Sequence, residues 1–228
     1  MSGSMAFRPP VILQGRQVCL APLSHGHLEA LVRAGDSPEI WEYLHAGDSR
    51  GPERMRALIQ TLLDRQAAGT DLAFTVLAVP GLEPIGMTRY LHILREDRCV
   101  EIGGTWYARA RWRTAVNTES KLMLLRHAFE TEGCHRVELR TDERNVRSQR
   151  AIERLGALKE ALLREHMVRR DGTFRSSYVY GIVASEWPAV RARLELRLAA
   201  GGAPGADRAH PTSVSTAESP GAALHGTP

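Results

Sequence analysis

The stretch that decides the fold runs from Trp112 to Ser148 and reads WRTAVNTESKLMLLRHAFE, a break at Gly133, then HRVELRTDERNVRS. This pattern predicts a polar loop, an amphipathic helix over 118–131, an alternating strand over 136–141 and the capped start of a helix over 146–155. A loop that runs into a helix start presents unpaired backbone N–H groups, which suit a phosphate. The segment therefore predicts an anion site that leads into a strand and a second helix able to carry chemistry.

Outward from this stretch, hydrophobic spacing predicts helices over 28–34 and 54–68 and a final helix from Trp187. Strands are expected over 18–23, 72–79, 84–92 and 99–107, and on both sides of the turn at Asp171-Gly172. Strands precede helices and then mix with them, which favours a mixed α/β sandwich with a largely antiparallel sheet. A doubly wound nucleotide fold would alternate more strictly and carry a GxGxxG turn, and neither feature is present.

Composition indicates one ordinary soluble domain, because 43% of the residues are hydrophobic and 25% are charged. The net charge of +4 favours anionic ligands but falls short of the charge density of a dedicated nucleic-acid binder. We expect a flexible start over 1–13, a folded domain over 14–198 and a disordered Gly-, Pro- and Ser-rich tail over 199–228.

The three cysteines, Cys19, Cys99 and Cys134, are isolated and form no CxxC pair. This argues against a disulfide framework and a zinc site and favours the reducing cytoplasm. No apolar run reaches the length of a membrane span and no signal-peptide pattern is visible. We therefore expect no metal and no membrane partner.

The order of elements and the residues of 112–148 resemble the acyl-CoA-binding half of the GNAT acetyltransferase superfamily. Within it they are similar to the RimJ/RimL-like branch of ribosomal-protein N-terminal acetyltransferases. The resemblance is clearest over 101–164. It implies a mixed sheet flanked by helices, with two neighbouring strands splayed apart to admit acetyl-CoA, and an acetyl transfer to a primary amine.

The loop before the helix at 118–131 is the expected cofactor site. Asn117 or Thr118 can cap that helix, and Arg111 and Arg113 add positive charge beside it. A solvated basic loop before an ordinary capped helix is the alternative. The resemblance implies that the family's Gln/Arg-x-x-Gly-x-Gly/Ala pattern falls here, with Ala115 as its last small residue and no first glycine. The expected cofactor contacts are Arg111, Arg113, Thr114, Ala115, Val116, Asn117 and Thr118.

The strand over 100–107 is expected to receive the rest of the cofactor. Alternate residues point to opposite faces of a strand. One face would hold Val100, Ile102, Gly104 and Trp106, and the other Glu101, Gly103, Thr105 and Tyr107. The resemblance implies that the backbone near Trp106, Tyr107 and Ala108 pairs with the pantetheine arm.

Acetylation of an amine requires that the ammonium lose a proton, that the oxyanion be stabilised and that the leaving thiolate be protonated. It requires neither a metal nor a covalent enzyme intermediate. Asn145 suits a helix N-cap and Ser148 falls in the first turn, so capping alone is one interpretation. The resemblance implies more, namely that Asn145 contacts the pantetheine and Ser148 protonates the thiolate.

Two carboxylates compete for the role of general base. Glu101 lies on the expected cofactor strand, but a flat strand would place it about 16 Å from Trp106, so it would need a bulge or a water chain. Glu160 matches the Glu of the family's Gly-Phe-x-x-Glu-Gly segment, in which Ala157 and Ala161 here replace Phe and the second Gly. Either carboxylate could instead be a structural ion-pair partner.

The resemblance implies that the region after the first helix forms the acceptor pocket, so Trp41, Tyr43 and His45 are candidate substrate contacts, with ordinary packing as the alternative. The acceptor stays open between a protein N-terminus and a small-molecule amine. A non-catalytic acyl-CoA-binding module and a nucleic-acid-associated protein are the competing functions. A homodimer is implied by the resemblance alone.

Overall fold

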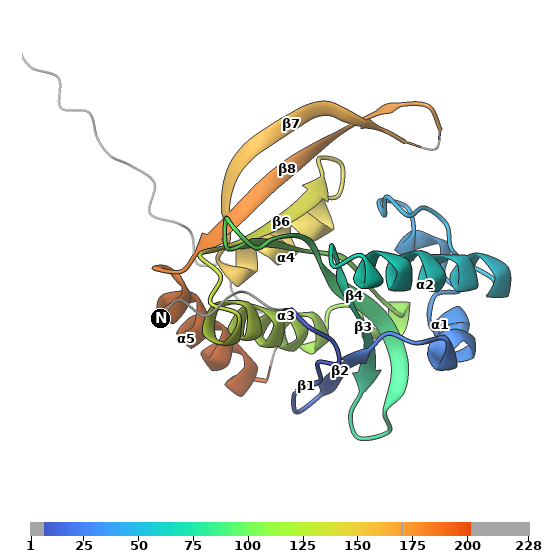
Figure 1. Ribbon diagram of the computed structural model, residues 1–228, viewed down its shortest axis with the longest axis horizontal. Helices are drawn as coiled ribbons and strands as arrows, with labels where there is room; N and C mark the ends of the chain where they lie inside the picture. Colours follow the sequence, from blue (N-terminus) through green and yellow to red (C-terminus); the bar gives the residue numbers. More distant parts are fainter. Residues whose placement is uncertain (1–6, 170, 202–228) are drawn as a thin grey trace, which may run out of the picture.

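The fold is built on one mixed sheet in the computed structural model, which describes residues 7–169 and 171–201 (Figure 1). In the described part of the chain, eight strands follow the order β1-β2-β3-β4-β5-β6-β8-β7. Every neighbouring pair is antiparallel except β5 and β6. The predicted, largely antiparallel α/β architecture is therefore confirmed. The strands are β1 (Leu13–Gln14), β2 (Val18–Pro22), β3 (Leu72–Ala78), β4 (Glu83–Leu94), β5 (Cys99–Tyr107), β6 (Arg136–Asp142), β7 (Leu158–Val168) and β8 (Phe174–Val183).

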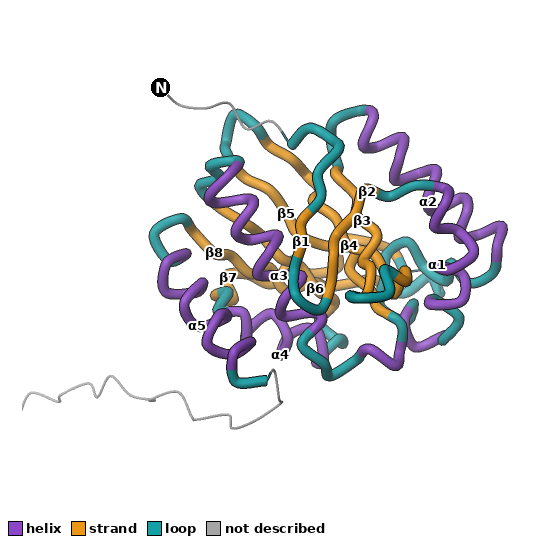
Figure 2. Tube along the Cα trace, turned by 90° about the horizontal axis from the view of Figure 1, so that it is seen from below, coloured by secondary structure: helices purple, strands orange, loops and turns teal. Residues whose placement is uncertain are grey.

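Helices cover both faces of this sheet. Figure 2 shows α1 (Leu28–Ala34) and α2 (Pro52–Ala67) grouped apart from α3 (Val116–Arg126) and α5 (Trp187–Ala199). The first pair buries its apolar residues with Met87 and Trp106, and the second pair packs on Tyr90 and Tyr180. The remaining helix, α4 (Val146–Leu155), packs beside β6. The sheet thus separates two hydrophobic clusters.

Local signals set the bounds of α4, which agree with the predicted range of 146–155. The side chain of Asn145 accepts a hydrogen bond from the Ser148 amide at 3.0 Å, so Asn145 is the N-cap. Gly156 follows the last turn with a φ of 101°, a left-handed conformation that favours glycine. The hairpin predicted around Asp171-Gly172 is also present, as β7 and β8.

The structure differs from the sequence-based predictions at the chain ends and in the helix predicted over 118–131. Phe7 has its ring buried against Tyr90 at 4.7 Å and its amide donates to Glu132, so this part of the expected flexible start packs on the folded domain, whereas residues 1–6 lie outside the described residues. Residues 202–228 of the expected tail lie outside the described residues.

The helix predicted over 118–131 starts earlier, at Val116, and continues after Arg126 as a wider π-helical turn over His127–Thr131.

A wedge opens between β5 and β6. Their parallel pairing joins Cys99–Glu101 to Arg136–Glu138, and the described residues show no pair beyond it. From that point β5 runs on to Tyr107 and β6 to Asp142. This is the predicted splaying of two neighbouring strands.

A β-bulge interrupts β5 inside this wedge. Met87 lies opposite Trp106 and Arg89 opposite Gly103, so two residues of β5 oppose only Thr88. Gly104 takes a φ of 56°, which glycine adopts without steric cost. The predicted strict alternation is therefore wrong beyond Gly103, because the extra residue reverses which face the following side chains meet. Tyr107 packs in the cluster of Val100 and Ile102, and Trp106 packs in the opposite one.

Candidate active site

The start of α3 lies at the open end of the wedge. Its N-cap residue, Ala115, makes no capping hydrogen bond, and the Thr114 hydroxyl accepts from the Val116 amide at 3.4 Å. The predicted caps, Asn117 and Thr118, are wrong because the helix begins before them; Asn117 instead accepts a hydrogen bond from the Tyr107 hydroxyl at 3.3 Å. The first-turn N–H groups thus present the positive end of the helix dipole to an anion.

The loop before α3 has the backbone shape of a glycine-containing loop without the glycine. Arg113 stands where the family pattern has its first glycine and takes a φ of 60°, in the left-handed region. That conformation costs an ordinary residue about 1 kcal/mol. Ala115 is buried, whereas the side chains of Arg111 and Arg113 are exposed. The loop thus places the small, buried Ala115 at the helix start and the exposed guanidinium groups of Arg111 and Arg113 beside it.

Trp112 ties this loop to both sides of the wedge. Its ring N–H donates to the Tyr107 carbonyl at 3.0 Å, and the Arg147 guanidinium lies 3.7 Å from the ring centre. Arg147 belongs to the first turn of α4, between Asn145 and Ser148. A cation–π contact of this kind stabilises by roughly 0.5–2 kcal/mol. The sequence alone does not single out Arg147; its only signal is a basic residue inside the Asn-x-x-Ser turn.

The edge of β5 that faces the wedge offers a ligand fewer backbone N–H groups than the predicted contacts near Trp106, Tyr107 and Ala108 imply. The Ala108 amide donates to the Ile85 carbonyl at 2.7 Å and therefore points toward β4. Backbone groups of successive residues alternate between the two edges of a strand. Of Trp106, Tyr107 and Ala108, only Tyr107 thus directs its amide into the wedge.

A buried lysine, which the sequence does not single out, lies beneath the bulge. Lys121 of α3 is 5% exposed, and its ammonium donates to the Thr105 hydroxyl at 2.6 Å. Its other contact is the Thr88 hydroxyl at 3.5 Å. Burial lowers the pKa of Lys121 to about 7. Lys121 therefore links α3 to the residue that follows the left-handed Gly104.

Substitution of Lys121 tests whether the folded protein buries a charged ammonium group at this position. Below its folded pKa of about 7 the native state buries a cation, and above the unfolded value of about 10.4 both states are neutral. We expect Lys121→Met to raise the free energy of unfolding by roughly 2 kcal/mol near pH 6, and the gain to shrink as pH rises toward 10. Urea titrations across this range measure it, with Lys159→Met on the exposed β7 as the control. A gain that is independent of pH would contradict the buried charge.

Glu101 lies on the wedge strand, just before the bulge. Its side chain is 8% exposed, and its Oε2 lies 3.0 Å from His92 Nδ1 and 3.3 Å from Arg140 Nε. A β-carbon built on Gly103 would lie 3.2 Å from Oε1. The second carboxylate oxygen therefore extends along β5 toward the bulge. The structure thus provides the bulge that a base at Glu101 requires.

Glu160 lies in a different environment. Both of its carboxylate oxygens accept from the Arg136 guanidinium, one of them at 2.8 Å, and these hydrogen bonds lower the pKa of Glu160. Arg136 pairs with Cys99, where β5 and β6 are still joined. Asn145 and Ser148 follow the other end of β6. The structure therefore brings Glu160 together with Arg136 and not with Ser148.

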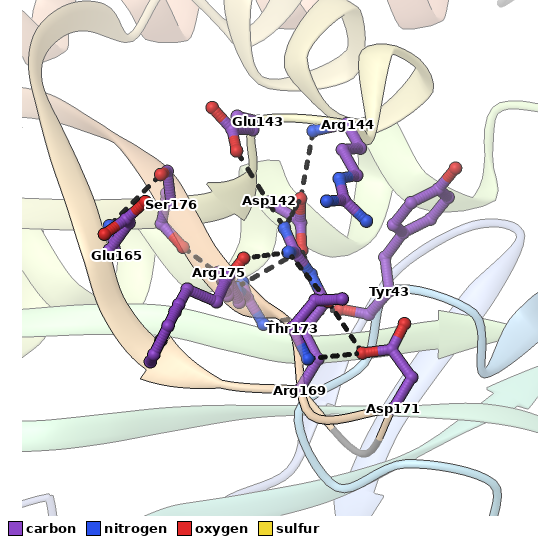
Figure 3. Close-up of polar contacts among 12 residues, drawn as sticks. Tyr43, Asp142, Glu143, Arg144, Glu165, Arg169, Asp171, Thr173, Arg175 and Ser176 are labelled. Atoms are coloured by element: carbon purple, nitrogen blue, oxygen red, sulfur yellow. Dashed lines mark hydrogen bonds and ion pairs between the residues drawn. The ribbon is translucent and has the colours of Figure 1, made fainter.

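The three candidate substrate contacts separate into two groups. Trp41 is buried 5.1 Å from the Trp106 ring and donates to the Gly35 carbonyl, so it packs behind β5. Tyr43 and His45 lie nearer to the β7–β8 hairpin, where Arg175 donates to the Tyr43 carbonyl at 3.5 Å (Figure 3). Burial, followed by the charge of Arg175, lowers the pKa of His45. Among the described residues, no group of three metal-ligating side chains occurs.

The model of the acetyltransferase (GNAT) domain family matches residues 17–158. This chain belongs to the GNAT acetyltransferase family. A T. thermophilus protein assigned as an acetyltransferase is 37% identical, with a TM-score of 0.75 over 83% of this chain and 97% of that one. The uncharacterized N-acetyltransferase p20 of Bacillus licheniformis is 23% identical over 70% of this chain and 88% of its own length. The Mycobacterium smegmatis RimJ in complex with CoA-disulfide shares the fold at 23% identity, with a TM-score of 0.68 over 81% of this chain and 89% of that one.

Acetyl-CoA is the acyl donor of the GNAT family, and the residues of this acetyltransferase fit it. The first turn of α3 and the Tyr107 amide at the open edge of β5 supply backbone N–H donors to it, and the left-handed Arg113 lies between them in the chain. No helix in the described part of this acetyltransferase is long and apolar enough to cross a bilayer.

Proposed function

We propose that this GNAT enzyme acetylates a primary amine, using acetyl-CoA and direct attack without a covalent enzyme intermediate. The observation that carries the proposal is the wedge between β5 and β6, which lies between the start of α3 and the Asn145 cap of α4. Acetyl-CoA supplies the acetyl thioester there. The phosphate groups would lie on the first turn of α3 beside Arg111 and Arg113, with Thr114, Val116 and Thr118 lining the turn.

Glu101 is the general base in this proposal. Its Oε1 extends toward the bulge, where an amine entering from the side of Tyr43 and His45 would reach it. Arg140 and His92 both lie against Oε2, which leaves Oε1 as the oxygen that faces the amine. Glu160 does not take this role here because Arg136 occupies both of its oxygens.

The remaining roles fall to groups at the open end of the wedge. The Tyr107 amide donates to the developing oxyanion. The Ser148 hydroxyl, half-buried in the first turn of α4, donates a proton toward the thiolate as a relay, and the side-chain N–H₂ of Asn145 is left to orient the pantetheine because its oxygen caps the helix. Tyr43 and His45 would contact the acceptor, and Trp41 would support β5 from behind.

The acceptor class that we propose first is a protein N-terminus. The resemblance to the RimJ/RimL-like branch supports it, and the solved structures that share the fold include RimJ and a ribosomal-protein-serine acetyltransferase of Vibrio cholerae. A small-molecule amine is the second candidate, because no acidic cluster in the linear sequence marks a groove for a cationic peptide. A cytoplasmic location and a homodimer belong to the same proposal; the exposed Leu158, Leu162 and Val168 of the edge strand β7 are a surface that a second copy would cover.

Thermal unfolding with acetyl-CoA and with free CoA tests the donor. A ligand that binds only the native state stabilises it by about 2.7 kcal/mol at one hundred times its dissociation constant, so we expect a clear rise in Tm. A panel of N-terminal peptides and small amines then tests turnover. Absence of a shift at millimolar acetyl-CoA would reject the proposal, and binding without turnover of any amine would favour a non-catalytic acyl-CoA-binding module.

A further inference from the structure

Acetylation of an ammonium group releases one proton to solvent in each turnover. The ammonium loses two protons, and the leaving thiolate takes up only one. A base at Glu101 must therefore discharge a proton after every cycle. Since the Glu101 side chain is 8% exposed, its carboxylate has little direct contact with water. This requirement rests on the proposed function of Glu101.

His92 lies between this carboxylate and the solvent. Its Nδ1 is 3.0 Å from Glu101 Oε2, and its side chain is 61% exposed. His92 has a φ of 50°, at an irregularity of β4 where the pairing register with β5 shifts between Leu91 and Leu94. The exposed ring of His92 therefore lies at this irregularity of the β4–β5 pair.

A hollow of about 430 Å³ lies beside the ring, with volume enough for water, and is lined by Thr70, His92, Ile93, Leu94 and Arg140. Arg140 reaches Glu101 from β6 and also donates to Glu138, which lies opposite Glu101 on the neighbouring strand. Arg89 and Arg175 also exert their charge on Glu101. These cations hold the carboxylate in place but cannot accept its proton, because arginine stays protonated. Of the described residues that contact the Glu101 carboxylate, His92 is the one that can both accept a proton and reach water.

We propose that His92 is the proton shuttle of this enzyme, carrying the proton that Glu101 takes from the amine to bulk water. An N–H bond of the ammonium breaks as an O–H bond forms on Glu101. In the neutral ring that accepts it, the hydrogen is on Nε2 and Nδ1 carries a lone pair; the protonated carboxyl group rotates so that its O–H faces Nδ1, and the O–H bond breaks as Nδ1 takes the proton. The exposed imidazolium turns outward and releases the same proton to water or a buffer base, which restores the neutral ring and the carboxylate.

Kinetics of His92→Gln test the shuttle against a structural role. We expect kcat to fall about tenfold while the KM values for acetyl-CoA and amine stay within a factor of about two. Added imidazole should restore kcat in His92→Gln but not in Glu101→Gln, because a mobile base replaces the shuttle only where the primary base is present. His25→Gln removes another exposed histidine, hydrogen-bonded to Gln60, and should change nothing.

A second readout needs no turnover. The ring ¹⁵N shifts of His92 in the protein without acetyl-CoA report which nitrogen carries hydrogen, and Glu101→Gln should change that pattern while Glu160→Gln should not. An unchanged kcat in His92→Gln, a loss that imidazole does not restore, or ring shifts that ignore Glu101 would overturn the shuttle. Full activity of Glu101→Gln would instead remove the proposed base and leave acetyl transfer itself standing.

Discussion

Glu101→Gln is expected to lower kcat by about 10²- to 10⁴-fold, the usual contribution of a positioned general base. The amide keeps the size of the side chain and can still accept from His92, but it cannot take the proton of the amine. Steady-state kinetics at saturating acetyl-CoA measure the effect. Because the change leaves α3 and the Arg111–Ala115 loop intact, the rise in Tm on acetyl-CoA binding should match that of the wild type.

Glu160→Gln is the matched control, since it makes the same change on β7, which β6 and β8 separate from β5 in the sheet. We expect its kcat to stay within a factor of about two, because Glu160 is paired with Arg136 at the closed end of the wedge. The reverse result, with activity lost in Glu160→Gln and kept in Glu101→Gln, would make Glu160 the base. That outcome would require β7 to move Glu160 away from Arg136 during the reaction.

The parts of the fold that the sequence predicts well are those with local signals. The bounds of α4 follow from Asn145 and Gly156, and both act through their immediate neighbours along the chain. The β7–β8 hairpin follows from Asp171-Gly172, where Asp171 accepts from the Thr173 amide. The loop and the helix α3 follow from the loop-to-helix pattern after Arg111, and the anion site there stays a prediction.

The parts that the sequence does not predict depend on contacts between distant segments. The helix α3 begins before the predicted cap Asn117, whose side chain is instead bonded to Tyr107 of the preceding strand. The bulge in β5 has a sequence signal in Gly103-Gly104, but strict alternation ignores it and reverses the faces of Trp106 and Tyr107. Likewise, strand periodicity shows that Glu101 lies on β5 but not that His92 and Arg140 meet its carboxylate.

Asp142 lies at the end of β6 and links three parts of the chain that are distant in the sequence (Figure 3). They are β6 itself, the β7–β8 hairpin and, through Arg175, the segment at Tyr43. The carboxylate is 2% exposed and accepts two hydrogen bonds from Arg169, at 3.0 and 3.1 Å, and one from the Arg144 amide. Arg175 lies 3.6 Å away and reaches on to the Tyr43 carbonyl. Figure 1 shows the long β7–β8 hairpin arching toward the segment before α2, and these two arginines anchor it there.

Asp142→Asn is expected to lower the free energy of unfolding by about 3–5 kcal/mol, because it leaves two largely buried guanidinium groups without their anion. Urea unfolding at neutral pH measures this loss. Asp171→Asn, on the exposed turn of the same hairpin, is the control and should have little effect. A variant of Asp142 as stable as the wild type would show that the hairpin is held by other contacts.

The pH dependence of this difference tests the charge itself. Burial alone would raise the pKa of Asp142, but the hydrogen bonds from Arg169 and the Arg144 amide outweigh it, so the net shift is downward. A carboxylate with a lowered folded pKa contributes its full stability above the unfolded value of about 3.9 and loses it as pH falls through the folded value. The gap between wild type and Asp142→Asn should therefore be constant near neutrality and close below about pH 4. Because the same carboxylate lies just before Asn145, a displaced hairpin should also raise the KM for the amine more than the KM for acetyl-CoA, which separates its effect from that of Glu101.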